Sequence, residues 1–85
     1  MTQATKMLLR VLLDAAGPLY GLEIATKADL PSGTIHPILA RLEKAKWLES
    51  SWEPIDPHAE GRPRRRYYKL TDEGAKLARE GLGGK

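Results

Sequence analysis

The chain has 85 residues, of which 41% are hydrophobic and 29% charged, and its formal net charge is +3. This length predicts a single domain with one modest core. The absence of cysteine excludes disulfides, thiolate nucleophiles and cysteine-based zinc sites, and fits a reducing cytoplasm as the expected location. The longest apolar runs are three residues, too short for a membrane span.

Residues 3–16 are predicted to form a helix that is apolar over most of its circumference and ends before Gly17-Pro18. Lys6, Arg10 and Asp14 recur every four residues as one narrow polar stripe. A helix serving a single core needs an apolar face only a little wider than 100°, so this helix is expected to be buried from more than one side. It is either the central helix of the domain or part of a subunit contact. The residues predicted for a dimer interface are Met7, Leu8, Leu9, Leu12 and Leu77.

Two further helices are expected next, separated by a short turn. Residues 20–28 predict a short helix that the sequence Asp29-Leu30-Pro31 breaks. Ser32 is expected to cap a third helix of about 14 residues, roughly 21 Å long. A helical period then directs one apolar set inward: Ile35, Ile38, Leu39, Leu42 and Trp47.

After Trp47 the period changes to that of a strand. Residues 48–52 alternate as in a strand with one apolar face, which predicts that Trp52 shares the buried face of Leu48. Residues 54–63 are expected to be a loop, and residues 64–70 a second strand. Thr71 is expected to cap a last helix. The order predicts a mainly α, α+β winged helix-turn-helix in residues 1–80, followed by a flexible glycine-rich tail in residues 81–85.

The second strand carries a concentrated positive charge. Five of the eight residues 62–69 are basic and none is acidic, whereas Glu43, Glu49, Glu53, Asp56 and Glu60 all precede this run. A basic strand with neighbouring tyrosines is typical of an edge that contacts phosphates. A solvated edge strand, protected by its charge against aggregation, has the same pattern.

Three segments resemble the PadR-type transcriptional regulators: GPLYGLEIA at residues 17–25, LPSGTIHPILARLEKAKWLE at residues 30–49, and GRPRRRYYKLTDEGAKL at residues 61–77. The resemblance covers residues 11–79 and implies a DNA-binding repressor, usually a homodimer. The family motif generally carries Tyr where this chain has His36. Family members usually continue into a longer C-terminal helix that helps to form the dimer, whereas the helix after Thr71 is expected to stop near Glu80.

Binding of double-stranded DNA is therefore the expected function. The third helix would enter the major groove, while the basic run would contact the backbone or the minor groove. Hydroxyl groups and free backbone N–H groups at the start of the third helix suit phosphates or base edges. The predicted DNA-binding residues are Ser32, Gly33, Thr34, His36, Pro37, Arg41, Arg62, Arg64, Arg65, Arg66, Tyr67 and Lys69.

Other functions find less support in the sequence. The sequence has no Ser-His-acid arrangement and no phosphate-binding glycine loop, so no catalytic residue or cofactor is expected. His36 and His58 lie on different elements, so no metal site is expected. Trp47 and Trp52 are either core residues or the walls of a pocket for a small aromatic effector. A winged-helix module that acts with a larger protein partner is the alternative function, but such a module has no need of so basic a run.

Overall fold

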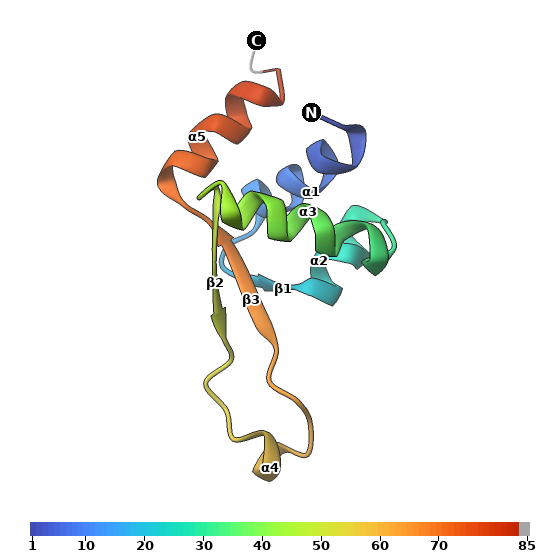
Figure 1. The fold of residues 1–85 in the computed structure, drawn as a ribbon, viewed down its shortest axis with the longest axis vertical. Coiled ribbons are helices and arrows are strands. Elements are labelled where there is room, and N and C mark those ends of the chain that lie inside the picture. Colours follow the sequence, from blue (N-terminus) through green and yellow to red (C-terminus); the bar gives the residue numbers. More distant parts are fainter. Residues whose placement is uncertain (84–85) are drawn as a thin grey trace.

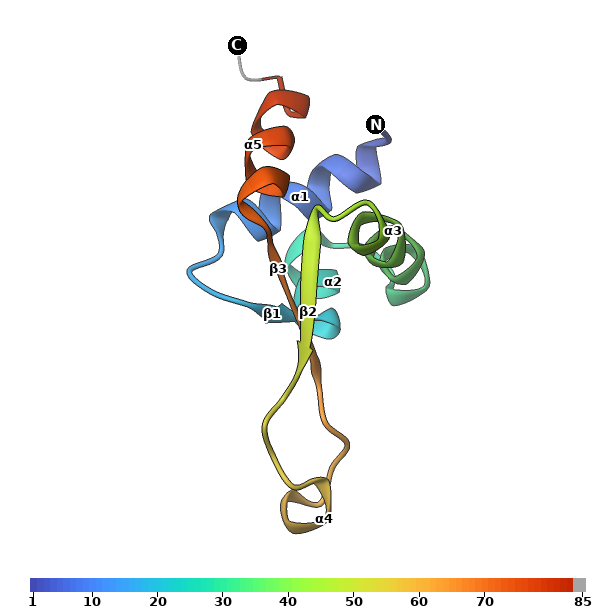
Figure 2. The same cartoon turned by 60° about the vertical axis from the view of Figure 1, so that its left-hand side comes forward.

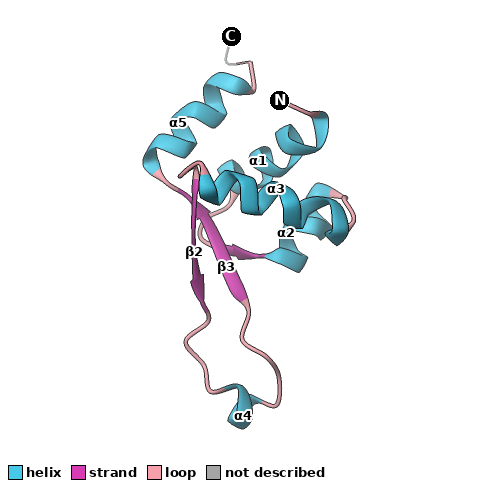
Figure 3. Ribbon diagram, viewed as in Figure 1, coloured by secondary structure: helices cyan, strands magenta, loops and turns pink. Residues whose placement is uncertain are grey.

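The computed structural model describes residues 1–83, in the order α1 (Gln3–Asp14), β1 (Leu19–Tyr20), α2 (Gly21–Ala28), α3 (Ser32–Lys44), β2 (Leu48–Trp52), α4 (Pro57–Glu60), β3 (Arg66–Leu70) and α5 (Asp72–Gly81) (Figure 1). The predicted winged-helix fold and its order of helices and strands are confirmed. The short strand β1 and the single-turn helix α4 were not predicted. Helices α1, α2, α3 and α5 cluster at one end of the molecule, and a hairpin with α4 at its tip projects from them (Figure 3).

Helix α1 is the central helix of the domain, since it contacts α2, α3, α5 and β3. Leu8, Leu9 and Leu12 are buried within the chain's own core. Their side chains cannot reach a second subunit, which corrects the interface predicted for these three residues. The helix ends at Asp14, two residues before the predicted end, because the following segment becomes extended and leads into β1. Leu19 of β1 adds a further buried side chain to the core.

The turn between α2 and α3 is closed by local hydrogen bonds. Asp29 adopts the left-handed conformation with φ 57°, and its N–H reaches the carbonyls of the last turn of α2. Ser32 is not the cap of α3, contrary to the prediction. Pro31, with φ −62° and ψ 147°, occupies that position. Its carbonyl accepts from the N–H groups of Thr34 and Ile35, so the helix begins one residue earlier than the serine pattern indicated.

The core forms where the inward faces of the helices meet. The largest side chains with essentially no exposure come from α1, α2 and α3, and they are Leu8, Leu9, Ile24, Ile35 and Leu39. Each such residue stabilises the fold by about 1.5–3 kcal/mol relative to an exposed position. The predicted inward positions of α3 are confirmed as buried for Ile35, Ile38 and Leu39, while Leu42 and Trp47 are half-buried.

The three strands form an antiparallel sheet in the order β1-β3-β2. β2 and β3 pair in the register Leu48↔Leu70, Ser50↔Tyr68 and Trp52↔Arg66, and with the loop between them they make the wing, residues 48–70. The wing extends away from the helices along the longest axis of the molecule (Figure 2). Trp52 therefore lies beyond the reach of the core and is 58% exposed, so its predicted burial is wrong.

Helix α5 follows the wing and packs against α1. The side chain of Thr71 accepts a hydrogen bond from the backbone N–H of Gly74, which confirms the predicted cap. Gly74 lies directly against the backbone of Trp47, where a Cβ atom would collide with the Trp47 carbonyl group. The helix includes Gly81, the first residue of the predicted tail, and residues 84–85 of that tail lie outside the described residues.

Candidate nucleic-acid interface

The outer face of α3 carries every site residue predicted on that helix. Packing of Ile35, Ile38 and Leu39 on the core turns the intervening positions outward, because an α-helix repeats every 3.6 residues. The six predicted residues of α3 are all exposed: Ser32, Gly33, Thr34, His36, Pro37 and Arg41. Among the described residues, none of their side chains makes a hydrogen bond or an ion pair, so this face keeps its donors and acceptors free.

His36 lies against the first residue of α2. A Cβ atom at Gly21 would approach Cε1 of His36 to 3.3 Å, so the missing side chain of this glycine leaves room for the imidazole ring. The contact places His36 in the angle between the two helices of the helix-turn-helix. Its exposed imidazole can donate to or accept from a base edge or a phosphate.

The arginine at the tip of the wing is held by a carboxylate. Arg62 donates from Nη1 and Nη2 to the two oxygens of Glu53, at 2.7 and 2.8 Å. The backbone N–H of Arg65 donates to the same carboxylate at 3.1 Å. The Arg62 hydrogen bond, supported by the Arg65 N–H, lowers the pKa of Glu53 from 4.5 to about 2 in spite of its partial burial, which acts to raise it. Arg62 is thereby fixed and its charge is compensated within the chain.

Arg66 is held in a second cluster, at the root of the wing. Its Nε donates to Oγ of Ser50 at 3.1 Å, and Ser50 in turn donates to Glu43 at 2.6 Å. The direct contact from Nη2 of Arg66 to Glu43 is longer, at 3.4 Å. The guanidinium also lies over the ring of Trp52, 5.1 Å from its centroid. The guanidinium group of Arg66 is therefore held at its edge by Ser50 and Glu43 and on its face by Trp52.

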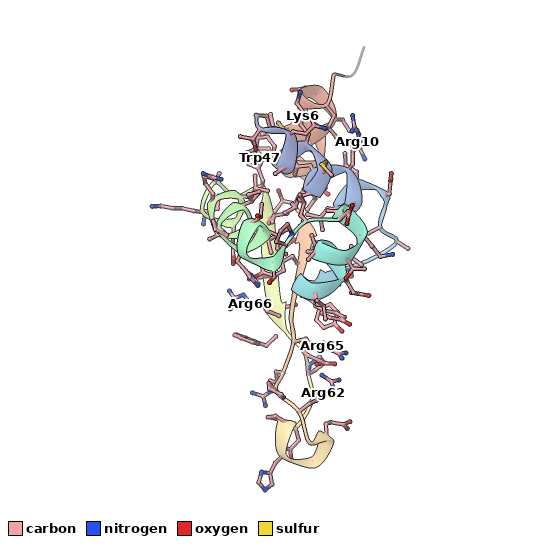
Figure 4. The ribbon with its side chains drawn as sticks, turned by 90° about the vertical axis from the view of Figure 1, so that its right-hand side faces the viewer. Lys6, Arg10, Trp47, Arg62, Arg65 and Arg66 are labelled. Carbon is pink, nitrogen blue, oxygen red and sulfur yellow. The ribbon has the colours of Figure 1, made fainter. Side chains whose placement is uncertain are left out.

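Two arginines of the wing have no carboxylate partner among residues 1–83. Arg64 donates from Nε to the carbonyl of Ile55 at 2.8 Å, which orients the side chain without compensating its charge. The guanidinium of Arg65 lies over the ring of Tyr20, 4.4 Å from the centroid, and Tyr20 meets Tyr67 edge to face at 5.5 Å. Arg65 and Arg66 project from opposite sides of the wing (Figure 4).

Lys69 has a weaker partner. Its Nζ lies 3.9 Å from the carboxylate of Glu49, the residue opposite it on β2, and both side chains are more than half exposed. A pair of this kind is screened by water and contributes at most about 1 kcal/mol. Lys69 is therefore free to exchange Glu49 for another anion.

The residues that restrain these arginines were not among the predicted site residues. All of them lie before the basic run: Tyr20, Glu43, Ser50 and Glu53. Ser50 and Glu53 contact arginines across the wing, while Tyr20 and Glu43 contact them from β1 and α3. The acidic stretch that precedes the basic stretch was the available signal, since a hairpin places two such stretches side by side. The sequence did not specify the register, so it could not pair individual residues.

The structure does not bring Trp47 and Trp52 together. They flank β2 at opposite ends, and the cavity beside Trp52 is lined by Pro57, Pro63 and Arg64. Within residues 1–83 there is no group of three His, Cys, Asp or Glu residues that could hold a metal ion. Over the same range, no helix is both long and apolar enough to cross a membrane.

Residues 8–80 match the Transcriptional regulator PadR-like family. The chain belongs to this family. The match covers the helix-turn-helix, the wing and nearly all of α5, so the elements that present the candidate interface are those of a DNA-binding transcriptional regulator. The family and the similar structures are regulators and not enzymes. Among curated protein sequences, none matches the chain significantly.

Solved structures are similar to the chain in fold, and one of them is itself described as PadR-like. A PadR-like regulator from Bacillus cereus is 27% identical with a TM-score of 0.69, over 89% of this chain and 74% of that protein. A protein from Ralstonia eutropha described as DNA-binding is 29% identical with a TM-score of 0.71, over 96% of this chain and 98% of its own. NadR in complex with 4-hydroxyphenylacetate is 30% identical with a TM-score of 0.78, and the match covers 99% of this chain but 54% of NadR.

Proposed function

We propose that this PadR-like regulator is a repressor that binds double-stranded DNA sequence-specifically, with α3 in the major groove and the wing on the backbone. The observation that carries the proposal is the free polar face of α3, which runs from Ser32 to Arg41 and lies beside a wing with two uncompensated arginines. A helix of 13 residues is roughly 20 Å long and fits across a major groove.

The wing contributes most of the affinity and α3 most of the specificity. Arg64 and Arg65 can neutralise phosphates without breaking an ion pair, whereas Arg62 and Arg66 would first have to leave Glu53 and Glu43. Arg64 and Arg65 are accordingly proposed as the principal phosphate contacts, with one of them in the minor groove. Arg41 contacts a phosphate beside the groove that α3 occupies.

The binding site is to be found by selection of duplexes from a random DNA pool at about 0.15 M salt, followed by sequencing. Arg64→Ala and Arg65→Ala should each weaken binding to all sequences and lower the slope of log affinity against log salt by about one unit. Arg10→Ala is the matched control, because Arg10 is exposed on α1 at the end of the body away from the wing (Figure 4). An unchanged slope in both wing variants would overturn the assignment.

We also propose that the regulator acts as a homodimer on an inverted repeat. Of the predicted interface residues, Met7 on α1 and Leu77 on α5 remain partly exposed and are the ones that a second subunit can cover. The two α3 helices should then lie about 34 Å apart, one turn of DNA. Sedimentation equilibrium of the wild type and of Met7→Glu/Leu77→Glu tests this assembly, and a selected site without two-fold symmetry contradicts it.

A small aromatic acid is the proposed effector class, with NadR and its bound 4-hydroxyphenylacetate as the supporting observation. In this chain a cavity of about 410 Å³ between α1, β1 and α2 has two charged lining residues, Asp14 and Lys27, and its other lining residues are Val11, Ala15, Ala16 and Leu19. Titration with 4-hydroxyphenylacetate should release the selected DNA from the wild type and not from Lys27→Met. Equal release from both proteins would exclude this cavity.

A further inference from the structure

A polar cluster joins the wing to α3 at one point. Glu43 lies in the last turn of α3, Ser50 on β2, and Arg66 and its stacking partner Trp52 face each other across β3 and β2. We call these four residues the root cluster. Ser50 lies two residues beyond Leu48, where β2 leaves the core, so the cluster bridges helix and wing just outside the apolar body.

The bridge runs through the hydroxyl group of Ser50. Ser50 Oγ accepts from Arg66 at 3.1 Å and donates to Glu43 at 2.6 Å, whereas Arg66 and Glu43 approach each other only to 3.4 Å. Hydrogen bonds with one charged partner are stronger than neutral ones and restrict geometry. The Trp52 ring holds the guanidinium from a further direction. A contact of DNA with Nε or Nη2 of Arg66 would therefore have to open this bridge.

We propose that the root cluster sets the angle of the wing relative to α3, and that Ser50 and Arg66 are positioning residues for sequence recognition. This inference rests on the proposed DNA-binding function. The wing joins the body through its strands, through the pairing of β1 with β3 and through the stacking of Arg65 on Tyr20. The root cluster adds the polar link to α3, so opening it at Ser50 lets the wing rotate relative to α3 and moves Arg64, which lies two residues from Arg66 toward the tip. When the angle is fixed, α3 and the wing contact DNA in one register. Only DNA sequences whose base edges match α3 in that register then allow the contacts of α3 and of the wing to form together.

The first test removes the bridge without changing charge. Ser50→Ala deletes the shared hydroxyl, and Ser51→Ala deletes an exposed hydroxyl on the next residue, for which the structure shows no hydrogen bond. With the selected duplex and a scrambled duplex at the same salt, Ser50→Ala should lower the ratio of specific to non-specific affinity about five- to tenfold, the size of a coupling between neighbouring groups. Ser51→Ala should leave the ratio unchanged. Equal ratios in both variants would overturn the positioning role.

The second test separates position from charge. Glu43→Gln and Glu49→Gln each remove one negative charge, and each carboxylate pairs with a cation of β3. Charge alone raises the affinity of both variants for every duplex. The positioning role predicts in addition that Glu43→Gln loses specificity and Glu49→Gln does not. If the affinity of both variants rises and neither loses specificity, the positioning role is contradicted.

The third test is independent of DNA. The chain has two tryptophans, so a proton–nitrogen NMR spectrum contains two indole signals, and Trp52→Phe assigns them. Ser50→Ala and Glu43→Gln should shift the Trp52 signal, because Arg66 leaves the ring, while Ser51→Ala and Glu49→Gln should not. If the wild type selects no DNA site, the proposed function and the positioning role both fail. If it selects a site and Ser50→Ala keeps full specificity, only the positioning role fails.

Discussion

The helical body and the wing are held together by different forces. In the body, side chains such as Leu8, Ile24 and Leu39 are buried, and within residues 1–83 no polar or charged residue is buried with them. Beyond Leu48 and Leu70 the wing has no comparable apolar interior, and its shape rests on Arg62–Glu53, the root cluster and the strand pairing. Because apolar burial already stabilises the body, the polar face of α3 needs no partners within the chain. The wing, in contrast, uses part of its positive charge in ion pairs that hold its own structure.

This difference changes how the basic run is interpreted. A count of arginines suggests a uniform phosphate-binding edge, yet Arg62 and Arg66 are compensated within the chain while Arg64 and Arg65 are not. Under the proposed function the two sets have separate roles. The paired arginines fix the direction of the wing, and the unpaired ones contact the anionic partner.

The largest effect on stability is expected from a deletion in the body. Leu39→Ala removes a side chain that is 1% exposed and should lower the free energy of unfolding by about 2–5 kcal/mol. Lys44→Ala, on the same helix but exposed, should change it by less than about 0.5 kcal/mol. Urea unfolding followed by circular dichroism measures both. Similar losses would contradict the burial of Leu39 in the core.

A glycine at the junction of body and wing gives the next effect. Gly74→Ala would force a Cβ atom into the backbone of Trp47 and should cost about 1–3 kcal/mol, as overpacking does. Gly17→Ala is the matched change, since nothing lies within 4 Å of its added Cβ. The same urea experiment compares them. If Gly74→Ala is as stable as Gly17→Ala, the close contact of α5 with Trp47 is not important for the fold.

In the wing the expected effect is local and depends on pH. Because the folded state lowers the pKa of Glu53 to about 2, its contribution is fully present above about pH 4.5 and is lost as the pH falls toward 2. The backbone N–H signal of Arg65, which donates to this carboxylate, should titrate in NMR spectra with a midpoint near 2. Glu53→Gln should abolish the titration, and Glu49→Gln should leave it intact. A midpoint near 4.5 would show that Arg62 does not hold Glu53.

The smallest effect is expected at the outer pair of the wing. Glu49→Gln breaks a contact of 3.9 Å between two side chains that are each more than half exposed, so it should change the free energy of unfolding by less than about 0.5 kcal/mol. Thermal unfolding at low and high salt provides the measurement. A larger loss would mean that the wing depends on its exposed charges as much as on its restrained ones.

Local sequence patterns determined most of the secondary structure. The spacing of Ile35, Ile38 and Leu39 predicts the buried side of α3, Thr71 predicts the start of α5, and the alternation in residues 48–52 predicts β2. These features depend on residues two to four positions apart, so they can be recognised without knowledge of the rest of the chain. The predicted polar face of α3 follows directly from its buried face.

Only the tertiary structure decided which groups are free. Leu8, Leu9 and Leu12 face the chain's own core because four other elements surround α1. Trp52 is exposed because the end of β2 extends beyond the helical body. Arg66 meets Glu43 across 23 positions of sequence. Such contacts depend on the hairpin register and on where α3 ends relative to β2. Composition and local periodicity specify neither the register nor the position of the helix end. The number of charges in the wing therefore follows from the sequence, whereas their pairing does not.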